Sequence, residues 1–212
     1  FLGNKLALQV AALAQDPAVG VAYSNGIYFR TTPNEPVGCV LDGLPTPSGW
    51  VFGELLVGNF LAPPVVLIRR TALDAVGWFD ESRALYAVED FDLWLRLAAY
   101  VPFVYAPGHV AAIRRHAGGI SRDTASLRRG VLNVLERCDQ HLPTMVARVP
   151  AARHEAYALN HGAIALAELR ARRWAQAFAQ GTKAGQHLLH LPGLGVPALR
   201  AWRRRNRIRG DS

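Results

Sequence analysis

The sequence predicts an α/β domain that is followed by an α-helical extension. In residues 1–123, short apolar runs typical of strands alternate with segments of helical period, whereas strand signals nearly vanish after about residue 126. The charge changes at the same place. Residues 1–123 carry nine Lys and Arg against eleven Asp and Glu, and residues 124–212 carry fifteen against five, within a net charge of +8. We therefore divide the chain into an α/β region (1–123), a helical extension (124–191) and a basic tail (192–212).

The α/β region begins with a helix over residues 5–13, which Asp16-Pro17 ends because the residue before a proline is disfavoured in the α conformation. A strand over 19–24 follows, and then a turn-rich stretch that forms either a hairpin or a long loop. The remaining elements are short and alternate in type. They are a helix at 50–57, a strand at 65–68, helices at 71–76 and 88–100, and strands at 103–105 and 110–113 that Pro107-Gly108 separates.

The extension is rich in Ala, Leu and Arg at helical spacing, and it predicts helices at 127–142, 151–169 and 172–189. The last two resemble a helical hairpin with its turn at 170–173. This segment resembles a single tetratricopeptide-like unit, but one unit cannot bury its own apolar face and no second copy follows. We interpret the segment as a helical appendage.

Composition excludes several classes of protein. The two cysteines, Cys39 and Cys138, lie far apart without a CxxC motif, which argues against a disulfide scaffold, a structural zinc site and a thioredoxin-like motif and favours a reducing compartment. The longest uncharged stretch, 97–113, is shorter than the roughly 20 apolar residues of a membrane span. No secretory signal pattern follows Phe1, and we interpret this start as a truncation.

The segment 89–96 (EDFDLWLR) is the most informative one. On a helix, Asp90 shares a face with Leu93, Trp94 and Leu97, which places a carboxylate at the edge of an apolar stripe. We expect Asp92 and Arg96, four residues apart on another face, to form an ordinary exposed ion pair. Two interpretations of the acids stay open: they complement the helix dipole, or Asp90 is a general base over a substrate hydroxyl.

A family resemblance rests on this segment. Residues 77–81 (GWFDE) followed by 88–96 (VEDFDLWLR) resemble the "GxFDE … EDxDLWLR" signature of family 2 glycosyltransferases with the GT-A fold. Four flanking pieces resemble family elements in the same order, at 5–9, 19–24, 58–70 and 113–121. The resemblance covers residues 1 to about 123.

The resemblance implies a Rossmann-like GT-A domain that transfers a sugar from a nucleotide-activated donor to an acceptor hydroxyl, with inversion and without a covalent intermediate. It implies that Asp90 is the catalytic base and Glu89 a supporting carboxylate. Trp94 is expected to pack under the substrate site. Gly58 and Asn59 either shape the acceptor pocket or form a helix C-cap.

The same resemblance makes His116 a candidate ligand of the Mg²⁺ or Mn²⁺ that accompanies the donor diphosphate, with a plain surface residue as the alternative. Arg114 and Arg115 are candidate phosphate contacts, and at most one of them serves because a strand directs them to opposite sides. We assign Asp80 and Glu81 no chemistry, since an Asp at such a junction commonly accepts from local backbone donors.

The family also binds its donor through an N-terminal βαβ half with a DxD metal motif. In residues 1–123 the only Asp-x-Asp spacing is Asp90-Phe91-Asp92. We therefore expect this chain to be an incomplete GT-A domain, its acceptor-side half, and to have little activity alone. No QxxRW element lies between residues 96 and 126, which predicts a nonprocessive enzyme.

The basic tail has six arginines and a tryptophan in residues 200–209. It is either a solvated end or a contact for an anionic membrane surface, and we do not expect it to bind nucleic acid because no recognised binding fold accompanies it. The expected role is cell-surface polysaccharide or glycan biosynthesis on a glycan or lipid-linked acceptor, in the cytoplasm or peripherally at the inner face of the membrane. The alternatives are a non-catalytic basic adaptor for membranes or nucleic acid, and a degenerate carbohydrate-binding remnant.

Overall fold

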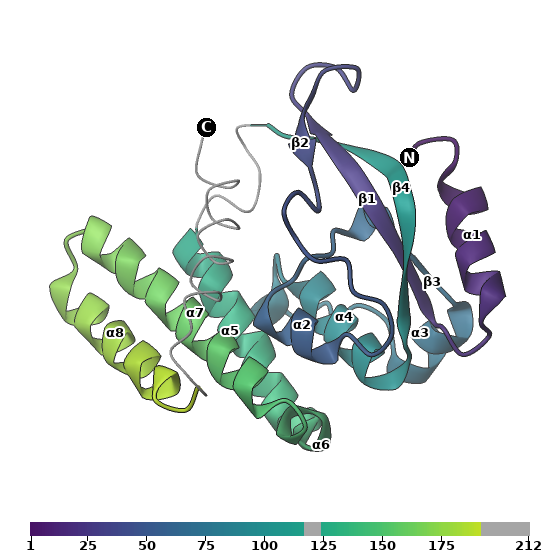
Figure 1. Cartoon of the computed structure of the whole chain (residues 1–212). Coiled ribbons are helices and arrows are strands. Elements are labelled where there is room, and N and C mark those ends of the chain that lie inside the picture. Colours follow the sequence, from purple (N-terminus) through teal and green to yellow (C-terminus); the bar gives the residue numbers. More distant parts are fainter. Residues whose placement is uncertain (117–123, 192–212) are drawn as a thin grey trace. The chain divides into compact units, whose positions relative to one another are not determined.

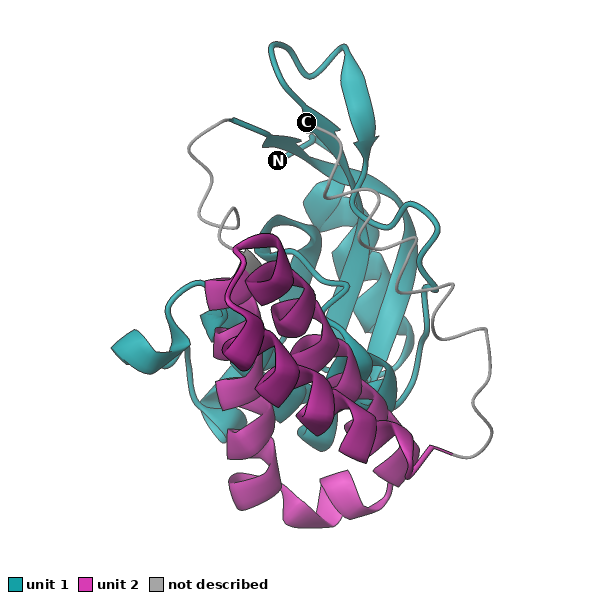
Figure 2. Ribbon diagram, turned by 90° about the vertical axis from the view of Figure 1, so that its left-hand side faces the viewer, with its two compact units in different colours: residues 1–122 teal, residues 123–212 magenta. Residues whose placement is uncertain are grey.

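A computed structural model describes residues 1–116 and 124–191 of the chain. The chain divides into two compact units, residues 1–122 and 123–212 (Figure 2). The first unit is mixed α/β and contains an open four-stranded sheet. The described part of the second unit consists of helices joined by short connections.

The central strand of the sheet is β1 (Val21–Phe29). On one edge it pairs in parallel with β4 (Phe103–Arg114). On the other edge it pairs antiparallel with β3 (Val66–Ile68) near its start and with β2 (Pro36–Cys39) near its end (Figure 1). Of the two options for the turn-rich stretch, the chain therefore forms the hairpin, β1–β2.

Two strand predictions are wrong in their boundaries. The strand expected at 19–24 is the first half of the longer β1, and the two strands expected on either side of Pro107-Gly108 are one strand, β4. The β1–β4 ladder shifts register between Tyr23 and Asn25, where the partners jump from Tyr105 to His109. Such a bulge takes up extra residues without ending the pairing, and the positive φ of 141° at Gly108 suits glycine.

Helices cover the sheet in this unit. The first helix, α1 (Lys5–Gln15), packs against β1 and β4, whereas α4 (Glu89–Tyr100) packs against α2 (Phe52–Val57) and α3 (Arg70–Val76). In Figure 1, α1 lies on one side of the sheet and α2 and α4 lie on the other. Adjacent residues of β1 pack on the two faces of the sheet. Ala22 joins Leu13 in a core cluster, and the Tyr23 ring lies 5.5 Å from the Phe60 ring.

A buried polar network fastens α1 to the sheet. Lys5 Nζ donates to Gln9 Oε1 at 2.7 Å and to the Val66 carbonyl at 3.0 Å, and Gln9 Nε2 donates to the Val65 carbonyl at 2.7 Å and to Ser24 Oγ at 3.2 Å. Both α1 side chains are buried, so each bond replaces one that water would supply. The network therefore fixes where α1 lies along β1 and β3.

The second unit contains α5 (Thr124–His141), α6 (Pro143–Ala147), α7 (Pro150–Arg170) and α8 (Trp174–Leu188). These confirm the three predicted helices and add the short α6. Helix α7 packs against both α5 and α8 (Figure 1). Across α5 and α7, Arg153 donates to both oxygens of Asp139 at 2.7 Å. Among the described helices, none is long and apolar enough to cross a membrane.

Histidines gather where α7 meets α8. His154 Nδ1 and His187 Nδ1 lie 3.1 Å apart, so one nitrogen donates and the other accepts. The His187 ring stacks on Tyr157 at 4.8 Å, and the His190 ring stacks on His154 at 4.5 Å. His161 Nδ1 lies 2.7 Å from Gln180 Oε1, also across the two helices.

Acid should loosen this packing. Burial, reinforced by the positive charge of the nearby His154, His161 and Arg153, lowers the pKa of His187 to about 4. A histidine pKa below its ordinary 6.5 means that the folded chain binds the proton less tightly than the unfolded chain. The stabilising contribution is therefore complete above about pH 6.5 and is lost as the pH falls toward 4.

We therefore expect the chain's Tm to fall between pH 7.5 and 5.0, and we expect His187→Gln to reduce that fall because it removes the titrating ring. Circular dichroism melts at the two pH values measure this. His141→Gln is the matched control, since His141 is an exposed histidine. Equal decreases in Tm for the two variants would contradict the assignment to His187.

Candidate functional site

The candidate site lies at the first turn of α4, where Asp90 is held between backbone and side-chain donors. Asp90 Oδ1 accepts from the Phe91 backbone N–H at 2.7 Å, and Oδ2 accepts from Asn59 Nδ2 at 3.4 Å. Asn59 follows α2 and is itself fixed, because its Oδ1 accepts from the Leu61 N–H at 3.0 Å. The structure therefore brings together two residues that the sequence analysis singled out separately.

Burial makes the Asp90 carboxyl less acidic than usual. Loss of water around it, reinforced by the neighbouring Glu89 carboxylate, raises the pKa of Asp90 to about 6, while the bonds from Phe91 and Asn59 act in the opposite direction. No ion pair among the described residues includes Asp90. A carboxylate with a pKa near neutrality accepts and releases a proton at physiological pH.

The rest of α4 is anchored in the core. Its face contains Leu93, Trp94 and Leu97, all at most 2 % exposed. The Trp94 ring lies 6.4 Å from the Phe79 ring in an edge-on arrangement. Trp94 thus packs beneath the first turn, and its buried indole Nε1 has no hydrogen-bond partner among the described residues.

The expectation of an exposed Asp92–Arg96 ion pair is wrong. Asp92 is buried, and Arg96 Nε donates to its Oδ2 at 2.8 Å. The same guanidinium donates to the carbonyl oxygens of three consecutive residues after α3, Val76, Gly77 and Trp78, at 2.7, 3.1 and 2.9 Å. The helical spacing alone could not reveal this, because the carbonyls come from a loop about twenty residues away in the chain.

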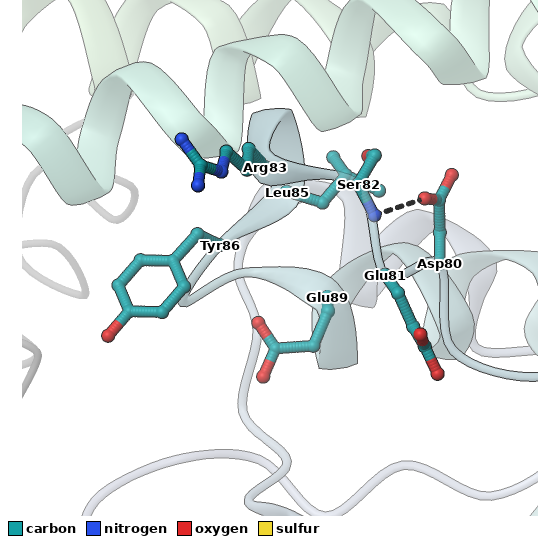
Figure 3. Close-up of a pocket in the computed structure, with 7 residues that line it drawn as sticks. All are labelled: Asp80, Glu81, Ser82, Arg83, Leu85, Tyr86 and Glu89. Carbon is teal, nitrogen blue, oxygen red and sulfur yellow. Dashed lines mark hydrogen bonds between the residues drawn. The ribbon is translucent and has the colours of Figure 1, made fainter.

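That loop leads to a pocket of about 150 Å³ beside Glu89. Figure 3 shows Glu89 between Tyr86 and Glu81 in this view. The lining residues come from the loop and from the start of α4. They are Asp80, Glu81, Ser82, Arg83, Leu85, Tyr86 and Glu89. Glu89 belongs to both features, since it lines the pocket and precedes Asp90.

Sequence reasoning missed most of this pocket. The prediction that Asp80 accepts from local backbone is confirmed, because its Oδ1 accepts from the Ser82 N–H at 2.8 Å. Arg83 and Tyr86 were given no role, although they stand between the two halves of the signature, and Glu81, the last residue of its first half, was assigned no chemistry. Their place in or between the parts of the signature is the sequence signal that could have identified them. The positive φ of 68° at Ala87 further marks the loop's junction with α4 as strained.

The remaining candidates lie elsewhere in the first unit. Arg114 Nε donates to the Arg30 carbonyl at 3.3 Å, and the Arg115 guanidinium lies 4.5 Å from the centre of the Tyr28 ring. These contacts tie both arginines to the β1–β2 hairpin rather than to α4. Gly58 is the C-cap of α2 and donates its N–H to the Glu54 carbonyl at 3.3 Å, as the alternative interpretation expects.

The described residues do not group into a metal site. His116 is exposed and ends the described part of the first unit. Within residues 1–116 and 124–191, no group of three His, Cys, Asp or Glu side chains is arranged to hold a metal ion. We therefore derive no step of a reaction through a metal. The basic tail lies outside the described residues.

The two aspartates of α4, Asp90 and Asp92, should respond in opposite ways to neutralisation. The raised pKa of Asp90 means that the folded chain binds this proton more tightly than the unfolded chain, so stability falls as the pH rises from about 4 through about 6. At pH 7.5 the ionised carboxylate is destabilising. We expect Asp90→Asn to raise the free energy of unfolding at that pH by about 1 kcal/mol.

Asp92→Asn should instead lower it by about 2 kcal/mol, because it leaves the partly buried Arg96 without its carboxylate. Urea denaturation at pH 7.5 compares the two variants. Asp74→Asn is the control, since Asp74 is exposed and its replacement should stay within about 0.5 kcal/mol. Destabilisation by Asp90→Asn as large as that by Asp92→Asn would refute this account of Asp90.

Comparison with known proteins adds one finding. The sequence profile of the family described as "Glycosyltransferase like family 2" matches residues 40–157, more than half of the 212-residue chain. The match includes α2, α4, the pocket loop and β4. No curated protein matches the chain.

Proposed function

The chain belongs to the glycosyltransferase-like family 2, whose activity in general is glycosyl transfer from a nucleotide-sugar donor to an acceptor, and from this premise we propose that Asp90 is the base of an inverting transfer. The proposal places Asp90 next to the acceptor hydroxyl, within hydrogen-bond reach of its proton. It takes the fold to be a GT-A domain, of which the first unit supplies the acceptor side.

The proposed reaction is a single displacement. The acceptor oxygen attacks the anomeric carbon of the donor sugar while its proton passes to Asp90. The bond from that carbon to the nucleotide diphosphate breaks, and the diphosphate leaves with the electron pair. Attack from the face opposite the leaving group inverts the anomeric configuration, and no covalent enzyme intermediate forms.

One observation carries this proposal: Asp90 is a desolvated carboxylate without a cationic partner among the described residues. Asp90 is partly buried, and structural carboxylates shielded from water are ordinarily paired with an arginine or lysine, as the more deeply buried Asp92 is with Arg96. The raised pKa of Asp90, about 6, suits a base that is ionised at pH 7 and that still has a useful affinity for a proton. An acid that only complemented the helix dipole would gain nothing from this loss of contact with water.

The pocket beside Glu89 supports an acceptor role for this surface. Three carboxylates and one guanidinium line it, together with the exposed ring of Tyr86. A negative pocket repels the anionic diphosphate of a donor and favours a neutral sugar, whose hydroxyls donate to carboxylates. We propose that Glu89 holds the acceptor on the side next to Asp90.

In the proposal, Asp90, Glu89 and the pocket do not bind the donor. A nucleotide-binding half with its own acidic motif would hold the diphosphate and a Mg²⁺ or Mn²⁺ ion, with His116 as a further candidate ligand, and residues 1–123 without it would have little activity. The proposed setting is nonprocessive synthesis of a cell-surface polysaccharide or glycan, on a glycan or lipid-linked acceptor. Family membership favours this over the basic adaptor.

We expect Asp90→Asn to lower kcat at least about 100-fold in the natural full-length protein, because the amide cannot accept the proton. The assay measures nucleoside diphosphate release from a panel of UDP-, GDP- and TDP-linked sugars, and calorimetry checks that donor affinity is nearly unchanged. Retained turnover would remove Asp90 from its role.

The wild-type rate should rise with pH through about 6, since only the ionised carboxylate acts as a base. Asn59→Ala removes a hydrogen bond that favours the ionised form, so the midpoint of this rise should move to higher pH. Asp74→Asn, at an exposed position on α3, should leave rate and midpoint unchanged. A midpoint that does not move in Asn59→Ala would show that another group controls the profile.

A further inference from the structure

Helix α8 has two unlike faces. Its buried residues, Ala177 and Ala184, face α7, against which the whole helix packs (Figure 1). On another face, Trp174 and Phe178 stand one turn apart, and Leu189 follows three turns beyond Phe178. We call these three residues the α8 face.

The α8 face is apolar and strongly exposed. Trp174 is 67 % exposed, Phe178 79 % and Leu189 85 %, and these are among the most exposed large apolar side chains of the described chain. Leu169, at the end of α7, is also exposed. Leaving such side chains in water costs free energy that packing on α7 does not recover, so a set of them on one side of a helix marks an interaction surface.

Positive charge accompanies this face without negative charge. Within the described residues 169–191, the chain contains four Lys and Arg and no Asp or Glu. In the turn before α8, Arg173 pairs with the buried Glu168, whereas Arg170 and Arg172 are exposed and no ion pair among the described residues includes them. The surface beside Trp174 is therefore cationic as well as apolar.

We propose that the α8 face, with Arg170 and Arg172, is a docking surface for an anionic lipid bilayer. Tryptophan and phenylalanine insert at the boundary between headgroups and acyl chains, and arginines beside them contact lipid phosphates. The helix lies in the plane of the membrane surface, as amphipathic peripheral helices do. The proposal rests on the second unit alone and does not depend on the transfer reaction.

A bilayer suits this surface better than a nucleic acid does. Arginines attract the phosphates of either partner. Leu169 and Leu189, however, are aliphatic side chains that cannot stack on bases, and they gain free energy only where they leave water. Only the bilayer takes up both the apolar and the cationic parts of the surface.

The test is co-sedimentation of the full chain with two kinds of vesicle. One is phosphatidylcholine alone, and the other contains roughly 30 mol % phosphatidylglycerol, which gives the vesicle a negative surface potential. We expect binding to the anionic vesicles, weakened by 0.5 M salt, which is roughly the level at which screening shortens the reach of charges to a few ångströms. Trp174→Ala/Phe178→Ala should lower the partition coefficient at least about tenfold, because it removes the inserted rings.

Matched controls test whether binding depends on this face, rather than on any pair of exposed aromatics or on net charge alone. Trp50→Ala/Tyr100→Ala removes two comparably exposed aromatics of the first unit and should leave binding unchanged. Arg170→Gln/Arg172→Asn should weaken binding to anionic vesicles, whereas Arg30→Gln/Arg148→Gln, with the same loss of charge, should have little effect. Circular dichroism verifies the fold of each variant.

Brominated acyl chains provide a second measurement, because they quench only inserted indoles. Quenching should decrease in Trp174→Phe and persist in Trp50→Phe. Unchanged partitioning of Trp174→Ala/Phe178→Ala, or no binding to anionic vesicles, would overturn the proposal. Tighter binding to duplex DNA or to RNA that is insensitive to the aromatic substitutions would overturn it as well and would make nucleic acid the partner.

Discussion

The guanidinium of Arg96 is the constraint on which the candidate site depends. It joins α4 to the loop after α3, because it donates hydrogen bonds to the Asp92 carboxylate and to three successive backbone carbonyls. Five fixed donors let one arginine do this, whereas a lysine ammonium lacks the planar geometry. The loop so held carries Phe79, which packs on Trp94, and continues into the pocket residues. The position of the pocket beside α4 therefore depends on this one side chain.

Asp90 and Asp92 show how one helical turn supports two different carboxylates. Asp92 faces Arg96 and is stabilised by it, whereas Asp90 faces Asn59, a neutral donor that lowers its pKa only partly. An asparagine orients the carboxylate without neutralising it. The chain thus keeps a costly charge in the first turn of α4, whose following residues are mostly buried, close to the strained backbone at Ala87. Such local costs are typical of functional positions, where stability is lost for reactivity.

The second unit distributes its polar groups differently. Its ion pairs join helix to helix, as Arg153 does with Asp139 and Arg129 with Glu168, so charges and packing fix the same arrangement. The histidines stack at the contact between α7 and α8, where their rings fill space that aliphatic side chains would fill in an ordinary bundle. The neutral His187 ring is part of this packing, since its pKa is lowered to about 4. The exposed aromatics stand on a face of α8 that this packing does not use.

The sequence by itself determined most of the helices, the α/β character of the first unit and the family, because periodicity and the signature around α4 are local properties of the chain. It also singled out Asp90, which lies at the edge of an apolar stripe and which the family resemblance made the candidate base. Strand ends were less predictable. Pro107-Gly108 reads as a break, yet the pairing of β4 with β1 continues through it because the bulge supplies room that no local pattern encodes.

Only the tertiary structure decided which partners the candidate residues have. Asn59 and Asp90 are 31 residues apart, and the pocket loop meets α4 through carbonyls that carry no side-chain signal. Arg114 and Arg115 were candidates by type and order, but the hairpin positions them. Residue types and spacing specify what a side chain is able to do, whereas burial and neighbours, which set its pKa and its partners, arise only when distant segments pack together.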